Sequence, residues 1–236
     1  MARRAAETQC CRSLVSCAAQ RSLYQGLANT ALWTVSVLLL ARAALAGPLD
    51  EMSLERWAKL REAERYQLNI AEKYYREQNW KVALAEYEKF LTLYERSEGA
   101  PYAQLKWSLC QVQLRKLNTA IKDGYQSVID YWPNSPEAIA SRYFIARTYK
   151  DMGETQQARK AYAAVLMHHP RHLVAVLSRV DLIDMARVQG DQQTCVKLWR
   201  ELVFDTDRTD PPARQACIDA SQQLAAYYFS QAALSE

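Results

Sequence analysis

The chain of 236 residues is 50% hydrophobic and carries only six glycines and seven prolines. It is therefore long enough to bury a continuous core and poor in the residues that punctuate strands, so we expect almost no sheet. Five of the 30 basic residues but only one of the 26 acidic residues lie in the first 46 positions, which leaves 25 of each in the rest of the chain. A charge-balanced domain without a basic stripe lacks the main driving force for sequence-independent nucleic-acid binding, and we expect none.

The first 46 residues have the features of a secretory signal peptide. A basic leader precedes an apolar run over 31–41, and Ala44-Leu45-Ala46 follows it before Gly47. A leader of this kind with a small-x-small ending is typical of a cleaved signal, and the apolar run is too short to span a bilayer comfortably. We therefore predict a signal peptide over 1–46 and an exported domain over 47–236, located in the periplasm or cell envelope.

Two alternatives to cleavage stay open. In the first alternative, the leader is retained as a signal anchor, and the domain lies outside the cytoplasm but stays attached to the membrane. Arg42 disfavours a retained anchor. In the second, the arginine-rich and acid-poor leader is an organelle transit peptide. Only an uncleaved leader would bring the chain into contact with a membrane.

The domain after the leader contains a repeat with an almost constant period. Small residues recur at intervals of 37, 38 and 37 positions, at Ala83, Ala120, Ala158 and Cys195. Four places later stand Tyr87, Gly124, Tyr162 and Trp199, and three places beyond those stand Phe90, Ser127, Val165 and Leu202. A period in this range indicates a helical solenoid, because one helix pair cannot bury its apolar face alone. The alternative, an irregular helical bundle, leaves three near-equal intervals to coincidence.

The third copy of the repeat shows the pattern most clearly. Ala146 and Ala158 are small, so that two antiparallel helices can approach closely, and Tyr162 fills the gap beside them. Gly153 and Pro170 stand where the first and second helices should end. This pattern resembles the tetratricopeptide repeat. The resemblance implies an all-α fold, a right-handed α-solenoid of about four helix pairs plus a C-terminal helix over roughly 213–233.

The second copy fits the pattern least well. Trp107, Cys110 and Leu114 lie about three residues closer to the turn at 116–119 than the other copies suggest. We therefore predict that the connection between the two helices of this copy is shortened.

We expect no catalysis, no cofactor and no metal site. All three histidines lie between His168 and His172, and such a cluster can bind a transition metal. No further ligands follow at fixed offsets, however, and a cation at the end of a helix also interacts favourably with the helix dipole. Three cysteines lie outside the leader, Cys110, Cys195 and Cys217, in no metal-binding or redox spacing, and we expect them to be buried and structural.

The resemblance also implies where a partner binds. In tetratricopeptide arrays the first helices of successive units line a concave wall whose exposed positions meet ligands. We predict a partner-binding groove made of Tyr75, Arg76, Arg115, Lys116, Tyr143, Arg147, Lys150 and Arg187. Within it, Tyr75, Arg115, Lys150 and Arg187 are expected to form a line, mainly cationic, that suits an extended acidic peptide.

The alternative for the same positions is a solvated face with ordinary charges. Leu68 and Glu72 stand where the chaperone-tail clamp of some family members needs Lys and Asn, so the resemblance does not imply that specificity.

The segment from Asp130 to Ala138 resembles the junctions of bacterial cell-envelope tetratricopeptide proteins. These include outer-membrane assembly lipoproteins of the BamD type and the periplasmic partner of the Tol-Pal system, and the similarity covers roughly 60–205. This chain lacks their lipid-attachment cysteine and their long N-terminal coiled coil, respectively. The resemblance implies an exported, non-catalytic scaffold that binds protein or peptide partners, in no particular oligomeric state. The alternative is the helical recognition subunit of a larger envelope enzyme or transport assembly.

Overall fold

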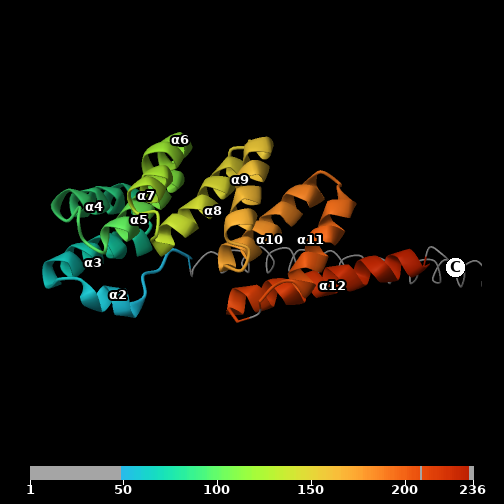
Figure 1. The fold of residues 1–236 in the computed structure, drawn as a ribbon. Helices are drawn as coiled ribbons and strands as arrows, with labels where there is room; N and C mark the ends of the chain where they lie inside the picture. Colours follow the sequence, from blue (N-terminus) through green and yellow to red (C-terminus); the bar gives the residue numbers. More distant parts are fainter. Residues whose placement is uncertain (1–48, 208, 234–236) are drawn as a thin grey trace, which may run out of the picture. The chain divides into compact units, whose positions relative to one another are not determined.

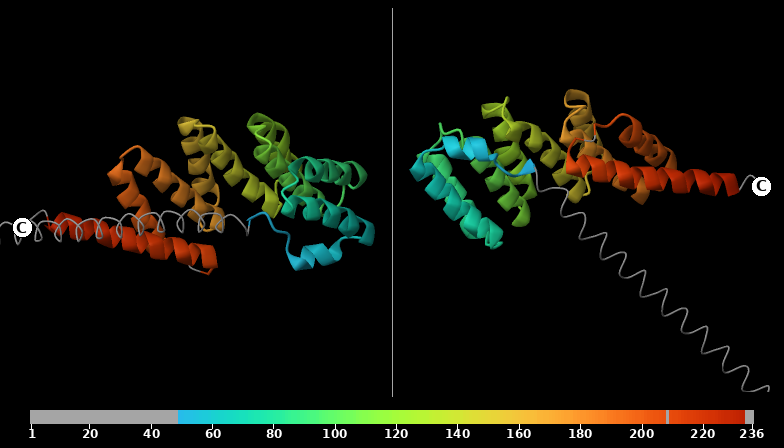
Figure 2. Two further views of the ribbon diagram at one scale, coloured as in Figure 1. Left: turned by 180° about the vertical axis from the view of Figure 1, so that it is seen from behind. Right: turned by 90° about the horizontal axis from the view of Figure 1, so that it is seen from below.

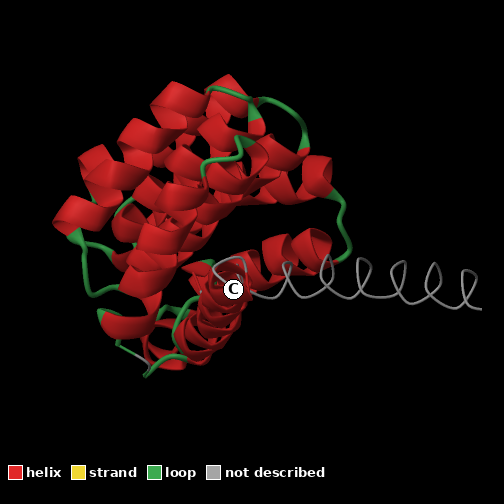
Figure 3. Ribbon diagram, turned by 90° about the vertical axis from the view of Figure 1, so that its right-hand side faces the viewer, coloured by secondary structure: helices red, strands yellow, loops and turns green. Residues whose placement is uncertain are grey.

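A computed structural model describes residues 49–207 and 209–233, which belong to a unit running from Pro48 to Glu236. The predicted signal peptide over 1–46 lies outside the described residues, and its cleavage stays a prediction. Helices and loops account for all of the described chain (Figure 3). None of the helices within these two ranges is long and apolar enough to cross a membrane.

The described residues form four helix pairs, preceded by a short helix and followed by a long one (Figure 1). We call the first helix of each pair the A helix and the second the B helix. The A helices are α3 (Glu62–Arg76), α5 (Ala100–Gln113), α8 (Pro136–Asp151) and α10 (Leu173–Val188). The B helices are α4 (Trp80–Leu93), the continuous run of α6 (Leu117–Thr119), η2 (Ala120–Tyr125) and α7 (Gln126–Tyr131), then α9 (Thr155–His168) and α11 (Gln192–Phe204). With α2 (Leu54–Lys59) and α12 (Pro211–Ala233), this confirms the predicted solenoid of four helix pairs plus a C-terminal helix.

All four pairs use the same turn between their helices. The residue that turns the chain has a left-handed backbone in each pair: Gln78, Arg115, Gly153 and Gly190, with φ of 59°, 62°, 80° and 71°. Each of these residues lies five positions before the small residue of its B helix. The predicted shortening of the second connection is therefore wrong.

The second A helix keeps the phase of the others but uses a polar residue at its close crossing. Ser108 lies seven positions before the turn residue, as Ala71 and Ala146 do, and all three are fully buried. Its hydroxyl donates a hydrogen bond to the carbonyl of Gln104 at 2.7 Å, so it can be buried without an unsatisfied donor. Because serine replaces alanine there, the hydrophobic pattern made the copy look displaced.

The second B helix contains a π-helical turn, η2, which inserts one extra residue. As a result Tyr125 and Val128, 1% and 0% exposed, occupy the places of the buried aromatic and apolar residues of the other pairs. The repeat pattern had assigned these places to Gly124 and Ser127. Gly124 instead lies against the A helix, where an added Cβ would be 2.3 Å from Ser108 Oγ. This inserted residue accounts for the interval of 38 among intervals of 37.

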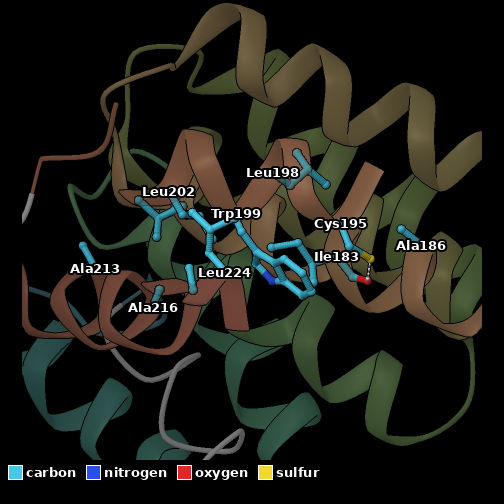
Figure 4. Close-up of a cluster of buried hydrophobic side chains, with 11 residues drawn as sticks. Ile183, Ala186, Cys195, Leu198, Trp199, Leu202, Ala213, Ala216 and Leu224 are labelled. Atoms are coloured by element: carbon cyan, nitrogen blue, oxygen red, sulfur yellow. Dashed lines mark hydrogen bonds between the residues drawn. The ribbon is translucent and has the colours of Figure 1, made fainter. Parts of the chain in front are cut away.

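The long helix α12 packs on α10 and α11 and closes the core of the last pair. Alanines spaced three or four residues apart put a flat, apolar face of α12 against Trp199 and Leu202 (Figure 4). Ala213, Ala216, Ala220 and Leu224 form that face. The Cys217 thiol donates a hydrogen bond to the Leu202 carbonyl at 3.0 Å. α12 thus takes the place that the A helix of a fifth pair would have.

Residues 49–60, which we call the N-terminal strap, lie beside the first A helices and include α2. In Figures 1 and 2 α2 and α12 lie on the same side of the helix pairs. Ser53 caps α2 by accepting a hydrogen bond from the Arg56 amide at 3.4 Å. Leu60, which follows α2, is 4% exposed and joins the core of the first pair.

Candidate partner-binding site

The A helices lie along one face of the array. Helix α8 contacts both α5 and α10, and α10 contacts α12, so the A helices are neighbours from the second pair onward, whereas the first two pairs meet mainly through α4 and α5. The B helices α4, α7 and α9 each contact the A helices before and after them. A ligand on the face along which the A helices lie therefore meets side chains of α3, α5, α8 and α10, and we call this face the A-helix wall.

A carboxylate on α3 ties the first two pairs together beside this wall. Glu72 Oε1 accepts hydrogen bonds from the hydroxyls of Tyr87 and Tyr102, at 2.5 and 2.7 Å. The Lys106 ammonium lies 3.9 Å from the same oxygen and 4.1 Å from the centre of the Tyr75 ring. Burial, with the Glu72 charge adding to it, raises the pKa of Tyr87 and Tyr102 far above the ordinary value. The two phenols therefore stay protonated and act as donors.

A second carboxylate arranges the third and fourth pairs in the same way. Asp181 Oδ2 on α10 accepts hydrogen bonds from the hydroxyls of Tyr143 and Tyr162, at 2.8 and 3.0 Å. Its other oxygen accepts one from the Lys150 ammonium at 2.5 Å, and Lys150 is also 3.7 Å from Asp184. We call the two arrangements the carboxylate nodes. Hydrogen bonds to charged groups are stronger than neutral ones, so each node fixes three neighbouring helices relative to one another.

Six of the eight predicted groove residues lie on A helices, but three of the six are engaged. Tyr143 is 4% exposed and serves the second node, and Lys150 is neutralised by Asp181 and Asp184. The half-buried Tyr75 ring lies 4.1 Å from the Lys106 ammonium, and burial, followed by the charge of Asp50, raises the pKa of the Tyr75 hydroxyl. These three side chains hold the wall in place, which the sequence did not reveal.

Of the other three residues on A helices, only Arg76 and Arg187 are more accessible. Arg76 and Arg187 are exposed in the last turns of α3 and α10, while Arg147 is half-buried near Asp181. Arg115 and Lys116 are exposed as well, but they lie in the turn after α5 instead of on the helix. The position equivalent to Tyr75, Lys150 and Arg187 is Val112. Binding by these residues stays a prediction.

The predicted cationic line along the wall is wrong. Arg115 is in a turn, Val112 takes its place, and the charge of Lys150 is balanced by two carboxylates. The error in Arg115 has the same origin as the predicted shortened connection, because both followed from a displaced alignment of the second copy. The wall is therefore mixed in charge, and Lys106 and Lys150 on it are paired with acids.

The N-terminal strap supplies contacts on the wall that the sequence reading missed. Asp50 Oδ2 is 3.2 Å from the Lys106 ammonium, and Arg56 Nη1 donates to Glu137 Oε1 at 2.5 Å. Lys106 and Glu137 are 3% and 4% exposed. The only available signal was the presence of single charges within otherwise apolar helix faces, since the strap itself lies outside the repeat.

The histidines and cysteines have structural surroundings. His168 ends α9, and His172 Nδ1 accepts a hydrogen bond from the Val174 amide at the start of α10. No group of three or more potential ligands among the described residues is placed to hold a metal ion. Cys110, Cys195 and Cys217 are free and buried, and burial raises the pKa of the Cys110 thiol to about 12.

Comparisons with known proteins agree with this architecture. A family model for the tetratricopeptide repeat matches residues 102–135, from the first turn of α5 to the residue that caps α8. A search of curated proteins finds no match. Among solved structures, a tetratricopeptide repeat protein from Parabacteroides merdae ATCC 43184 is similar, with 14% identity and a TM-score of 0.50 over 72% of this chain and 67% of that chain. At this identity the similarity shows the fold alone. The chain is thus an α-solenoid whose second helix pair matches the tetratricopeptide repeat and whose other pairs share its turn.

Proposed function

We propose that the chain is an exported, non-catalytic scaffold that binds a segment of a partner protein on the A-helix wall. The observation that carries this proposal is the N-terminal strap. It is a short polypeptide that already lies against α5 and α8 through two ion pairs, Asp50–Lys106 and Arg56–Glu137. A wall that holds one short segment through side chains has the chemistry needed to hold another.

The reactive groups of the chain support the non-catalytic part of the proposal. Each node carboxylate accepts two phenolic hydrogen bonds and lies beside an ammonium group, so its oxygens are engaged by donors of the protein itself. A thiol whose pKa is near 12 is protonated at neutral pH, so Cys110 is a poor nucleophile.

The exported part of the proposal rests on the leader sequence. Cleavage after Ala46 predicts a native chain beginning at Gly47. N-terminal sequencing of the native protein tests this, and a chain that begins at Met1 or Ala2 would contradict it. A retained leader would instead favour a membrane-attached scaffold. The alternative role, as the recognition subunit of a larger envelope enzyme or transport assembly, differs in having catalysis in the bound partner.

Site-specific crosslinking tests the binding surface. A photoreactive residue placed at Val188 in α10, which is 89% exposed, should crosslink a partner in native envelope fractions. Met167 in the B helix α9 is the matched control, since it is apolar and 73% exposed. One crosslinked protein obtained from Val188 and not from Met167 is the expected result. Crosslinks only from Met167, or none from either position, would contradict binding on the A-helix wall.

A further inference from the structure

The N-terminal strap contacts the A-helix wall at two charged points separated by six residues. Asp50 neutralises Lys106, and its charge also acts on the neighbouring Tyr75 hydroxyl. Arg56 bonds to Glu137 at the start of α8, and its Nη2 also donates to the Glu98 carbonyl at 3.2 Å. The strap therefore reaches from the C-terminal half of α3 to the N-terminal ends of α5 and α8.

Apolar contacts of the strap lie between and beside these charged points. Met52 and Trp57 are half-buried and pack against the core of the first pair. No residue of α2 is buried, and Leu54 is 86% exposed. The strap thus rests on the wall by a few side chains and does not form a layer of the core.

The two wall charges that the strap contacts would be left in different surroundings if the strap departed. Lys106 would keep Glu72 at 3.9 Å and the rings of Tyr75 and Tyr102, 4.1 and 5.5 Å away. An ammonium over aromatic rings is attracted by their electron-rich faces. Glu137 would lose Arg56, its ion-pair partner among the described residues, and would keep only the positive end of the α8 dipole, because it stands in the first turn of that helix. Its Oε2 has no hydrogen-bond partner among these residues even with the strap in place, so departure of the strap leaves Glu137 in need of a new cation.

We propose that the strap is an exchangeable occupant of the wall, and that the partner which replaces it carries the same chemistry. Such a partner segment presents an acidic side chain to Lys106 and Tyr75 and, six residues later, a cationic side chain to Glu137. Apolar residues two and seven positions after the acid take the places of Met52 and Trp57. This inference rests on the proposed function, which it deepens by naming the kind of segment bound.

Competition within one chain sets the size of the expected effect. A tethered segment acts at an effective concentration of roughly millimolar, so a free peptide of the same sequence binds weakly while the strap is in place. Reversing the two strap charges removes that competitor without altering the wall. The affinity of the free peptide should then rise by about tenfold or more.

The test uses the full chain and a labelled peptide of residues 49–60, measured by fluorescence anisotropy. The opened variant carries Asp50→Lys and Arg56→Glu. The matched control carries Glu51→Lys and Lys59→Glu, which make the same charge changes at exposed strap positions. The peptide should bind the opened variant at least about tenfold more tightly than the unaltered chain or the control. A peptide carrying the same two reversals should not bind the opened variant.

Three outcomes would overturn the inference. In the first, the peptide binds the unaltered chain, the control and the opened variant with equal affinity. In the second, the opened variant is folded but does not bind the peptide. In the third, cooperative unfolding is lost both in the opened variant and in the milder double variant Asp50→Asn, Arg56→Gln. The last outcome would make the strap part of the core. A partner crosslinked through Val188 together with any of these would leave the scaffold function standing. Peptide binding to the opened wall without a crosslinked partner would instead count against the scaffold function alone.

Discussion

The packing of Gly124 against Ser108 predicts a measurable cost for the smallest possible enlargement. In Gly124→Ala the new Cβ would lie 2.3 Å from Ser108 Oγ, 2.8 Å from its Cβ and 3.3 Å from its Cα. Cα is a backbone atom of the helix and Cβ is the first side-chain carbon. Rotation of the Ser108 side chain moves neither atom, so it cannot relieve the clash. Overpacking of this kind costs about 1–3 kcal/mol. Replacing a helical glycine by alanine returns about 0.5–1 kcal/mol, because alanine loses less backbone entropy on folding.

With the middle of each range, the net loss is about 1.2 kcal/mol, equivalent to a fall of about 2–5 °C in Tm for a domain of this size. Thermal and urea unfolding followed by far-UV circular dichroism measure it. The double variant Ser108→Gly, Gly124→Ala removes both clashing side-chain atoms, so the two substitutions should couple favourably by about the same amount. An unchanged unfolding midpoint and slope in Gly124→Ala would show that α5 and η2 do not approach as described.

Three further predictions concern packing, pH and thiol reactivity. Ala158→Leu at the fully buried crossing of α8 and α9 should cost about 1–3 kcal/mol in urea unfolding, whereas Ala164→Leu on the exposed face of α9 should not. Desolvation lowers the pKa of His172 below 6.5 against the opposing charge of Asp210, so the folded state resists its protonation. The contribution of His172 to the free energy of unfolding is therefore present above pH 6.5 and is lost as the pH falls below that value. The variant His172→Asn keeps a cap for α10, and in it the free energy of unfolding should depend less on pH in this range. The Cys110 thiol should resist alkylation at mildly alkaline pH in the native protein and react after unfolding, and fast labelling of the native protein would contradict its burial.

The period of the repeat was enough to predict the helix pairs, because burial of one apolar face imposes the same spacing on every unit. Ala83, Ala158 and Cys195 are buried where the pattern placed them. The second copy was misread because its departure from the pattern is one inserted residue within a helix. The clue was present in the interval of 38 before Ala158 and in the aromatic Tyr125, one position after Gly124.

The candidate site was less predictable than the fold. The resemblance to the repeat family predicted which helices form the wall, but it did not predict which of their side chains are paired with one another. An ion pair such as Lys150–Asp181 joins residues 31 positions apart, so it is not visible within one repeat. Nor could it indicate that residues before the first repeat, such as Asp50 and Arg56, cover part of the same wall. Such contacts depend on the course of the chain in space and leave no periodic mark in the sequence.

The two carboxylate nodes also determine where the solenoid can flex. One node joins the first and second pairs and the other joins the third and fourth, each through charge-assisted hydrogen bonds. The joint between the second and third pairs is made differently, by the stacked rings of Tyr125 and Phe144, whose centres are 5.8 Å apart. Stacked rings slide more easily than charged bonds stretch, so bending should concentrate at this joint. The Arg56–Glu137 ion pair spans the same joint from outside the repeats, and whatever segment occupies that position sets the curvature of the array.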